Sequence, residues 1–264
     1  MSTTFSRSER KYLPGNQRYH LTLNTVKKFV PVYMFEKNKP VTNVRTIYFD
    51  NDNFDTYYDW LNREPIRYKV RYREYGYDGK FSDDLWMELK IKNHAISQKK
   101  RFKLKRQHLE KFTAGEDVLK EVLRENKKNR DIVDAYTRIQ SHIVSHRLRP
   151  ILAMEYSRVS FQPCEDSDVR ITVDKDIVMR NLLNGEVVKD GCIVLETKVS
   201  GPRAPLWLND MMEELGTTQD VRFSKFASGV QRLFFRQQVC GLTELGEPST
   251  SEQMSPAAAK AGGK

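Results

Sequence analysis

Lys and Arg recur at every second position in stretches of this chain that otherwise have the composition of β-strands. In YKVRYREY, Lys69, Arg71 and Arg73 alternate with apolar and aromatic residues, and LWMELKIK and KKRFKLK repeat the pattern. Because successive side chains of a strand point to opposite faces, the cations lie on one face and the apolar residues on the other. Several strands with a cationic face form either a basic outer surface or a basic interior, and a basic interior requires a bound polyanion.

Eight strands are predicted from β-branched and aromatic enrichment, at about 5–12, 43–50, 65–76, 84–93, 97–106, 149–163, 168–179 and 191–199. Short Gly-, Asp- and Ser-rich segments between them favour antiparallel hairpins. Helical patterns fall at about 16–30, 53–62, 107–113, 117–147, 204–215 and 224–238. We therefore expect an α+β fold in which a mostly antiparallel sheet of eight strands closes into a barrel, with helices outside and cations in the lumen.

The composition favours an anionic partner. The net charge is +10 and the pI is near 9.4, which fits nucleic acid, a phosphorylated small molecule or an acidic membrane. Nucleic acid is disfavoured because an aromatic RNA-reading pattern is absent from the sequence. We expect one domain over residues 1–243 and a disordered tail over 244–264, which is rich in Ser, Pro, Ala and Gly.

The cysteines and the hydropathy indicate the cellular compartment. Cys164, Cys192 and Cys240 follow no metal-ligand spacing, and an odd number without a secretory signal indicates a reducing compartment. No apolar run approaches the roughly 20 residues that span a bilayer. These features predict a cytoplasmic protein without a transmembrane segment.

Nine short segments between residues 7 and 239 together resemble a known family. They are ERKY, TIYFDND, VRYREYG, ELK, QKKRF, RPILAMEYSR, VRITVD, VLETK and RFSKFASGV, in this order. The set resembles the catalytic domain of the vacuolar transporter chaperone (VTC) complex, a polyphosphate polymerase of the triphosphate tunnel metalloenzyme (CYTH-like) superfamily. The resemblance implies a phosphate tunnel with the C-terminal helix at its mouth.

The resemblance also implies a set of site residues. The catalytic set is Lys11, Arg71, Arg73, Lys90, Arg158, Arg170 and Glu196. The further residues that bind phosphate or polyphosphate are Lys99, Arg101, Tyr156, Lys198, Arg222, Ser224 and Lys225. Glu196 is the implied ligand for Mn²⁺ or Mg²⁺, with Glu9 as a second contributor; these ions take oxygen ligands and can complete their shell with water and phosphate.

The implied reaction transfers the terminal phosphoryl group of ATP, or another nucleoside triphosphate, to growing inorganic polyphosphate, with pyrophosphate or phosphate as related ligands. Hydrolytic relatives commonly carry further carboxylates where this chain has Arg7 and Lys198. Fewer carboxylates weaken the case for a second metal and an activated water, so transfer is favoured over hydrolysis. Hydrolysis of tripolyphosphate or another triphosphate, and non-catalytic binding of polyphosphate or inositol phosphates, remain alternatives. Association with membrane-bound subunits is left open.

Simpler interpretations accompany these hypotheses. Alternating cations on any one strand commonly form a solvated face, and Glu196 could form a structural salt bridge with Lys198. We expect three further lysines near the rim of the barrel or outside it, although they lie on the cationic face of their strands: Lys92, Lys103 and Lys105. The segment PLWLNDMMEEL, with Trp207, is typical of a packed helix, with a nucleobase shelf as the weaker alternative.

Overall fold

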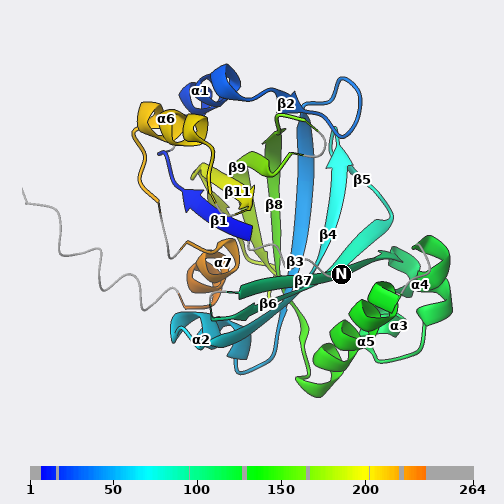
Figure 1. The fold of residues 1–264 in the computed structure, drawn as a ribbon. Coiled ribbons are helices and arrows are strands. Elements are labelled where there is room, and N and C mark those ends of the chain that lie inside the picture. Colours follow the sequence, from blue (N-terminus) through cyan, green and yellow to red (C-terminus); the bar gives the residue numbers. More distant parts are fainter. Residues whose placement is uncertain are drawn as a thin grey trace, which may run out of the picture.

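One antiparallel sheet organises the molecule (Figure 1). The computed structural model describes residues 7–15, 18–94, 96–126, 130–164, 167–201, 203–219 and 223–235. Within them the main strand order is β1-β11-β9-β8-β3-β4-β6-β7. The strands are β1 (Arg7–Tyr12), β3 (Val41–Asp50), β4 (Ile66–Tyr77), β6 (Asp84–Asn93), β7 (Ile96–Lys105), β8 (Arg149–Phe161), β9 (Val169–Asn181) and β11 (Val194–Ser200). The α+β class and the eight predicted strands are confirmed.

Three short strands extend this sheet. β2 (Val32–Tyr33) pairs with β8, β5 (Lys80–Phe81) pairs with β4, and β10 (Val187–Asp190) pairs with β9. They were not predicted, because two to four residues are too few to show an alternating pattern.

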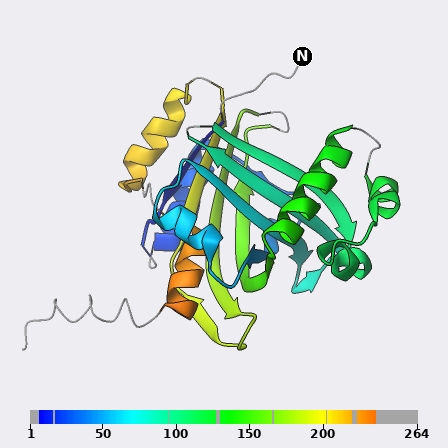
Figure 2. The ribbon, with the colours of Figure 1, turned by 90° about the horizontal axis from the view of Figure 1, so that it is seen from below.

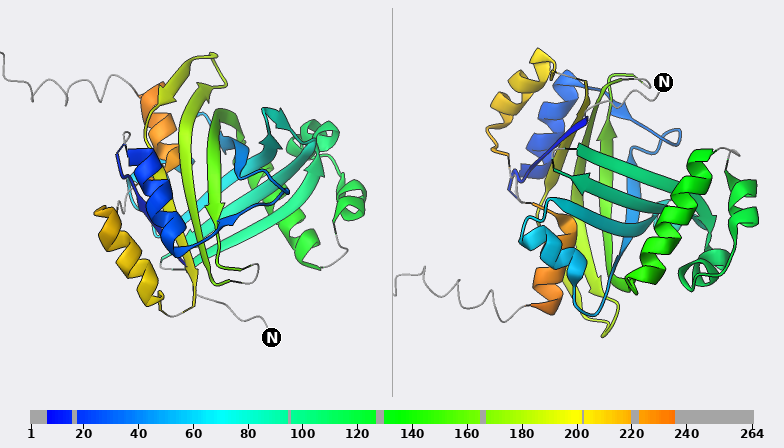
Figure 3. Two further views of the ribbon diagram at one scale, coloured as in Figure 1. Left: turned by 90° about the horizontal axis from the view of Figure 1, so that it is seen from above. Right: turned by 60° about the horizontal axis from the view of Figure 1, so that its bottom comes forward.

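The sheet curls into a half-barrel, which differs from the closed barrel expected from the sequence (Figure 3). β1 and β7 end the strand order, and no backbone pairing joins them within the described residues. Closure depends on the tilt and stagger of all the strands, which the local alternating pattern does not determine. Side chains cross the seam instead: Lys90 Nζ on β6 lies 3.3 Å from Glu9 Oε2 on β1.

Helices cover the outer face in two groups. α3 (Leu109–Thr113), α4 (Leu119–Glu125) and α5 (Arg130–Ser145) follow a 3₁₀ turn at Arg106–His108, and α5 crosses the strands β6 and β7 (Figure 2). The single helix predicted over 117–147 is thus two helices, with residues 127–129 outside the described part. On the other side, α1 (Tyr19–Phe29) packs beside α6 (Leu206–Leu215).

The apolar residues between the cations form the outer cores, as the alternation requires. Under the first helix group lie buried side chains from three neighbouring strands, Val70, Tyr72, Leu85, Met87, Leu89, Phe102 and Leu104. Under α1 and α6 lie Val159, Ile171, Val173 and Leu195. With these faces buried outward, the cations of the same strands face the concave side.

The last helix, α7 (Lys225–Phe234), packs on the concave side near α2 (Asp55–Leu61). It begins at Ser224, whose hydroxyl accepts a hydrogen bond from the Ala227 amide, as N-cap serines do. Gly229 allows close contact with β8, because a Cβ there would meet Leu152 Cδ2 at 2.6 Å. Phe226 packs against Tyr48 with ring centroids 5.2 Å apart. α7 therefore closes one end of the concave face.

Candidate anion-binding site

A buried three-residue ion cluster joins the sheet to α7. Asp174 on β9 is fully buried and lies 2.6 Å from Arg158 Nε and 2.8 Å from Arg158 Nη2. Its second oxygen also lies 2.6 Å from Lys225 Nζ. Burial alone would raise the pKa of Asp174, but the two cations outweigh it and hold the pKa below its ordinary value. The cluster fixes the N-terminal end of α7 against the strands.

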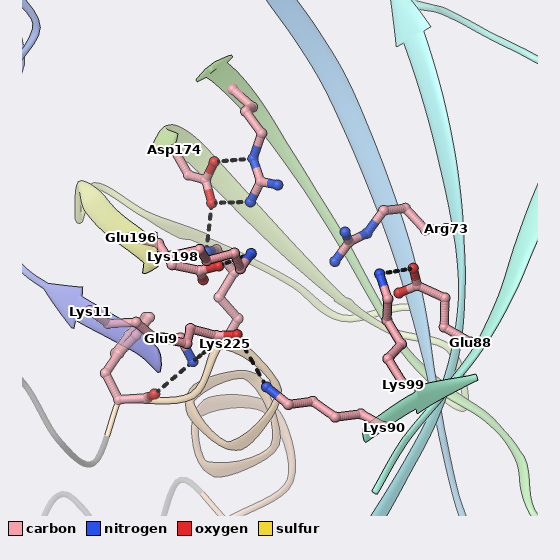
Figure 4. A network of polar contacts seen from close by, with 12 residues as sticks. Glu9, Lys11, Arg73, Glu88, Lys90, Lys99, Asp174, Glu196, Lys198 and Lys225 are labelled. Carbon is pink, nitrogen blue, oxygen red and sulfur yellow. Dashed lines mark hydrogen bonds and ion pairs between the residues drawn. The ribbon is translucent and has the colours of Figure 1, made fainter. Parts of the chain in front are cut away.

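Two more carboxylates lie nearby on β1 and β11. Glu196 is buried, forms an ion pair with Lys198, and is opposite Lys11 in the strand register. Glu9 contacts Lys11 at 3.4 Å and Lys90 at 3.3 Å. Burial and the charge of Glu196 raise the pKa of Glu9, but the lysines lower it to about 2 overall. We call Glu9, Asp174 and Glu196 with their strands the carboxylate wall (Figure 4).

The opposite side carries more exposed cations and is called here the cationic wall, made of Arg71, Arg73, Lys99 and Arg101 on β4 and β7. Glu88 accepts from Arg71 Nε at 2.8 Å and lies 3.4 Å from Lys99 Nζ. Burial would raise the pKa of Glu88, but Arg71 and Arg73 keep it far below its ordinary value. Arg73 donates to the Thr46 and Tyr75 hydroxyls at 3.3 and 3.4 Å. Side chains of the two walls point toward one another (Figure 4).

Lys69 belongs to this site; the alternation placed it on the cationic face, but the resemblance did not include it among the site residues. Its Nζ donates to the Ser224 hydroxyl at 3.2 Å and lies 4.6 Å from the centre of the Phe226 ring. Burial, and then the charges of Lys11 and Lys90, hold its pKa well below the ordinary value. A polyanion placed here would relieve this repulsion. The strand parity shared with Arg71 was the signal that could have identified Lys69.

The remaining predicted residues are distributed as follows. Tyr156 is buried, and its ring centre lies 5.3 Å from the Arg158 guanidinium and 5.1 Å from Lys225 Nζ. Arg170 donates to Gln162 Oε1 at 3.0 Å, farther along β9 from α7. Arg101 is exposed on β7. Arg222 lies outside the described residues.

The lysines expected near the rim also have definite positions. Lys92 is exposed, and Lys105 is paired with Asp84 at 2.5 Å. Lys103 is half-buried beside the Trp86 ring, 5.3 Å from its centre. Trp207 packs against the outer core under α1 and α6, so the nucleobase shelf considered for its segment does not face the cations.

The carboxylate wall can be tested for a divalent metal. Glu9 and Glu196 are close enough that the charge on Glu196 raises the pKa of Glu9. No group of three or more His, Cys, Asp or Glu side chains is arranged to hold a metal within the part of the chain described. A metal would thus take one or two carboxylates here and draw its other ligands from phosphate and water, as Mg²⁺ commonly does. The residues fit such an ion if Lys198 turns away from Glu196.

The arrangement defines a class of protein: a curled antiparallel sheet whose concave face gathers Lys and Arg side chains. Comparison with known proteins agrees. The chain belongs to the VTC domain family, whose model matches residues 6–234. The predicted family is therefore confirmed.

Curated relatives include vacuolar transporter chaperone complex subunit 4 of Schizosaccharomyces pombe, which is 24% identical over 79% of this chain and 34% of its own length. Subunit 4 of Trypanosoma brucei brucei is 25% identical over 81% of this chain and 32% of its own. Subunit 2 of Saccharomyces cerevisiae is 25% identical over 72% of this chain and 31% of its own length. This chain spans about a third of the length of these relatives.

Among solved structures, a putative adenylate cyclase from Bacillus halodurans has the same fold. The TM-score is 0.50 and the identity is 16%, over 87% of this chain and 99% of the other. This likeness supports the CYTH-like fold. In the described residues, no helix combines the length and apolar character needed to cross a membrane.

Proposed function

We propose that this domain is a polyphosphate polymerase, which transfers the terminal phosphoryl group of ATP to a growing polyphosphate chain. The observation that carries the proposal is the concave face, where Lys and Arg from two walls and α7 converge beside the Glu9 and Glu196 carboxylates. A phosphate chain offers many acceptor oxygens, and arginine and lysine bind them through charge-assisted hydrogen bonds. The family match and the relatives named as transporter chaperone subunits support a phosphate ligand.

The chain's own residues perform most of the steps in this proposal. Lys11, Lys90, Arg71 and Arg73 hold phosphate oxygens and align donor and acceptor. Arg158 and Lys225, fixed by Asp174, face the charge that develops on the transferred group. Their orientation is set before substrate arrives, because both are anchored by a buried carboxylate. Phosphoryl transfer depends mainly on such positioning and charge stabilisation.

Proton removal needs no dedicated base in this reaction. A terminal phosphate has a second pKa of about 6, so it is mostly dianionic near neutral pH and can attack directly. A divalent cation held by Glu196 and Glu9 would neutralise charge on the phosphoryl oxygens. Lys198, released from Glu196, would then be free to contact phosphate. A nucleotide substrate and the free thiols of Cys164 and Cys192 fit a cytoplasmic setting.

The test is a chain-length assay. Purified protein is incubated with ATP and Mn²⁺, and the phosphate products are resolved by length on a gel. We expect chains that lengthen with time, and loss of the Mn²⁺-dependent lengthening in Glu196→Gln. The control is Glu110→Gln, the same change at an exposed position on α3.

Other outcomes decide between the alternatives. Release of orthophosphate without lengthening would identify a triphosphate hydrolase. Binding of polyphosphate with no turnover of ATP would identify a binding module. Unchanged lengthening in Glu196→Gln with Mn²⁺ would refute the metal assignment.

A further inference from the structure

An indole ring lies on the concave face at the end away from α7. Trp86 on β6 has the same strand parity as Glu88 and Lys90, and it pairs with Arg73 in the register of β4 and β6. Its side chain is half-buried. A large aromatic ring among these cations adds a flat surface that phosphate binding does not use.

Two cations from β7 flank the ring. The Arg101 guanidinium lies 4.6 Å from the ring centre, and Lys103 Nζ lies 5.3 Å from it. Lys103 is opposite Trp86 in the register, and Arg101 is opposite Glu88, one step closer to the ion clusters. The guanidinium lies over the indole ring, and the two planar groups together form a stacking platform, because both stack well on aromatic heterocycles. The adjacent positive charge also suits a phosphate attached to the heterocycle.

The distance along the strands suits a nucleotide. Lys69 contacts Ser224 at the α7 end, and Arg73 follows four residues later on β4. At roughly 3.3 Å per residue, Arg73 and its partner Trp86 lie about 13 Å along the strands from Lys69. The cations that could hold phosphates occupy the space between. A triphosphate directed toward α7 would therefore leave its base near Trp86.

Other aromatic rings of the concave face are less suited to this role. Tyr48 and Tyr156 are buried, the first against Phe226 and the second beside Arg158 and Lys225. Tyr75 is half-buried, and its hydroxyl accepts a hydrogen bond from Arg73. Trp86 retains accessible surface next to an exposed Arg101.

We propose that Trp86 and Arg101 form the platform on which the base of the nucleoside triphosphate stacks. The inference rests on the proposed function in one respect, namely that the phosphoryl donor is a nucleotide. It assigns binding of the base to Trp86 and Arg101, and binding of the phosphates to the other cations of the concave face. The site then distinguishes ATP from inorganic tripolyphosphate through this contact.

The first experiment compares the affinities of ATP and tripolyphosphate for wild type, Trp86→Ala and Trp86→Phe by calorimetry. Stacking of a base on an aromatic side chain implies a roughly five- to hundredfold loss of ATP affinity in Trp86→Ala. Tripolyphosphate affinity is expected to stay unchanged, and Trp86→Phe is expected to retain most of the ATP affinity. Equal weakening of both ligands, or of neither, would overturn the proposal. The ratio of the two affinities corrects for any fraction of the variant that is unfolded.

A second measurement does not depend on the folding of the alanine variant. The chain has three tryptophans, so Trp60→Phe with Trp207→Phe leaves Trp86 as the fluorophore. We expect ATP to change its emission at concentrations where tripolyphosphate does not, and equal responses to the two ligands would refute the platform. The chain-length assay keeps the two proposals apart. A base-dependent signal without chain lengthening would support the platform and reject the polymerase. Chain lengthening in Trp86→Ala with an unaltered KM for ATP would support the polymerase and reject the platform.

Discussion

The carboxylate wall and the cationic wall face each other across one concave surface, and they balance charge differently. Asp174 and Glu196 are buried, and their cations are held in short ion pairs. On the other wall, Glu88 is shared between Arg71 and Lys99, while Arg73 donates to neutral hydroxyls. In the proposed function these differences correspond to two tasks: the carboxylate wall would fix geometry and offer metal ligands, and the cationic wall would supply cations to phosphate.

The largest effect is expected from Asp174→Ala on the carboxylate wall. Removing this carboxylate leaves Arg158 and Lys225 buried and unpaired, which should lower the free energy of unfolding by about 3–5 kcal/mol. Chemical denaturation measures the loss. Asp210→Ala, an exposed position on α6, is the control and should change stability by less than about 0.5 kcal/mol. A small loss in Asp174→Ala would mean that this wall does not depend on its ion cluster.

Arg73→Met tests the cationic wall. Arg73 donates to hydroxyls, and without it Glu88 keeps its ion pairs with Arg71 and Lys99, so the loss of stability should be smaller than in Asp174→Ala. A charge-assisted contact to phosphate is worth about 1.5–3 kcal/mol, so tripolyphosphate affinity should fall about ten- to hundredfold. Calorimetric titration measures this fall.

The control for Arg73→Met is Arg180→Met, which removes the same charge from an exposed position. If both variants lose equal affinity, net charge and not the wall accounts for binding.

Glu88→Gln should shift affinity in the opposite direction. Glu88 competes with phosphate for Arg71 and Lys99, so its neutralisation should tighten tripolyphosphate binding by a few-fold while lowering stability. Parallel titration and denaturation separate the two effects. Weaker binding in this variant would show that Glu88 orients the cations for phosphate and does not merely neutralise them.

The smallest effect concerns pH. Burial lowers the pKa of Lys99 to about 8, although Glu88 opposes the shift. Phosphate binds the protonated amine, so the Lys99 contribution to affinity is complete below pH 7 and is lost as the pH rises through 8. Titrations of tripolyphosphate from pH 6 to 9 should show this decline.

Lys99→Arg keeps its charge throughout this range. The variant should therefore bind with a flatter pH profile than wild type. Identical profiles would assign the decline to other groups.

Much of the fold could be predicted because strand alternation is a local property. The period of two places Val70 and Tyr72 on one face and Lys69, Arg71 and Arg73 on the other, whatever the remaining chain does. Closure of the sheet could not be predicted in this way. It depends on tilt, stagger and the contacts between two edges that are far apart in sequence.

The site was predictable in its cations and less so in their partners. Asp174 lies on the same face of its strand as Arg170, but the sequence did not assign it to the site. Its contacts with Arg158 and Lys225 depend on the register of β8 and β9 and on the packing of α7. Trp86 was inconspicuous among apolar neighbours, because its contacts with Arg101 and Lys103 come from another strand.

The sequence by itself determined the strands, the inward direction of the cations and the excess of positive charge. These follow from backbone geometry and composition, which act at each residue. Only the tertiary structure decided which carboxylate neutralises which cation, how α7 closes one end of the concave face and where the indole lies relative to the ion clusters. Those features depend on distances between side chains brought together by curvature and register, because electrostatic and stacking energies change steeply over a few ångströms.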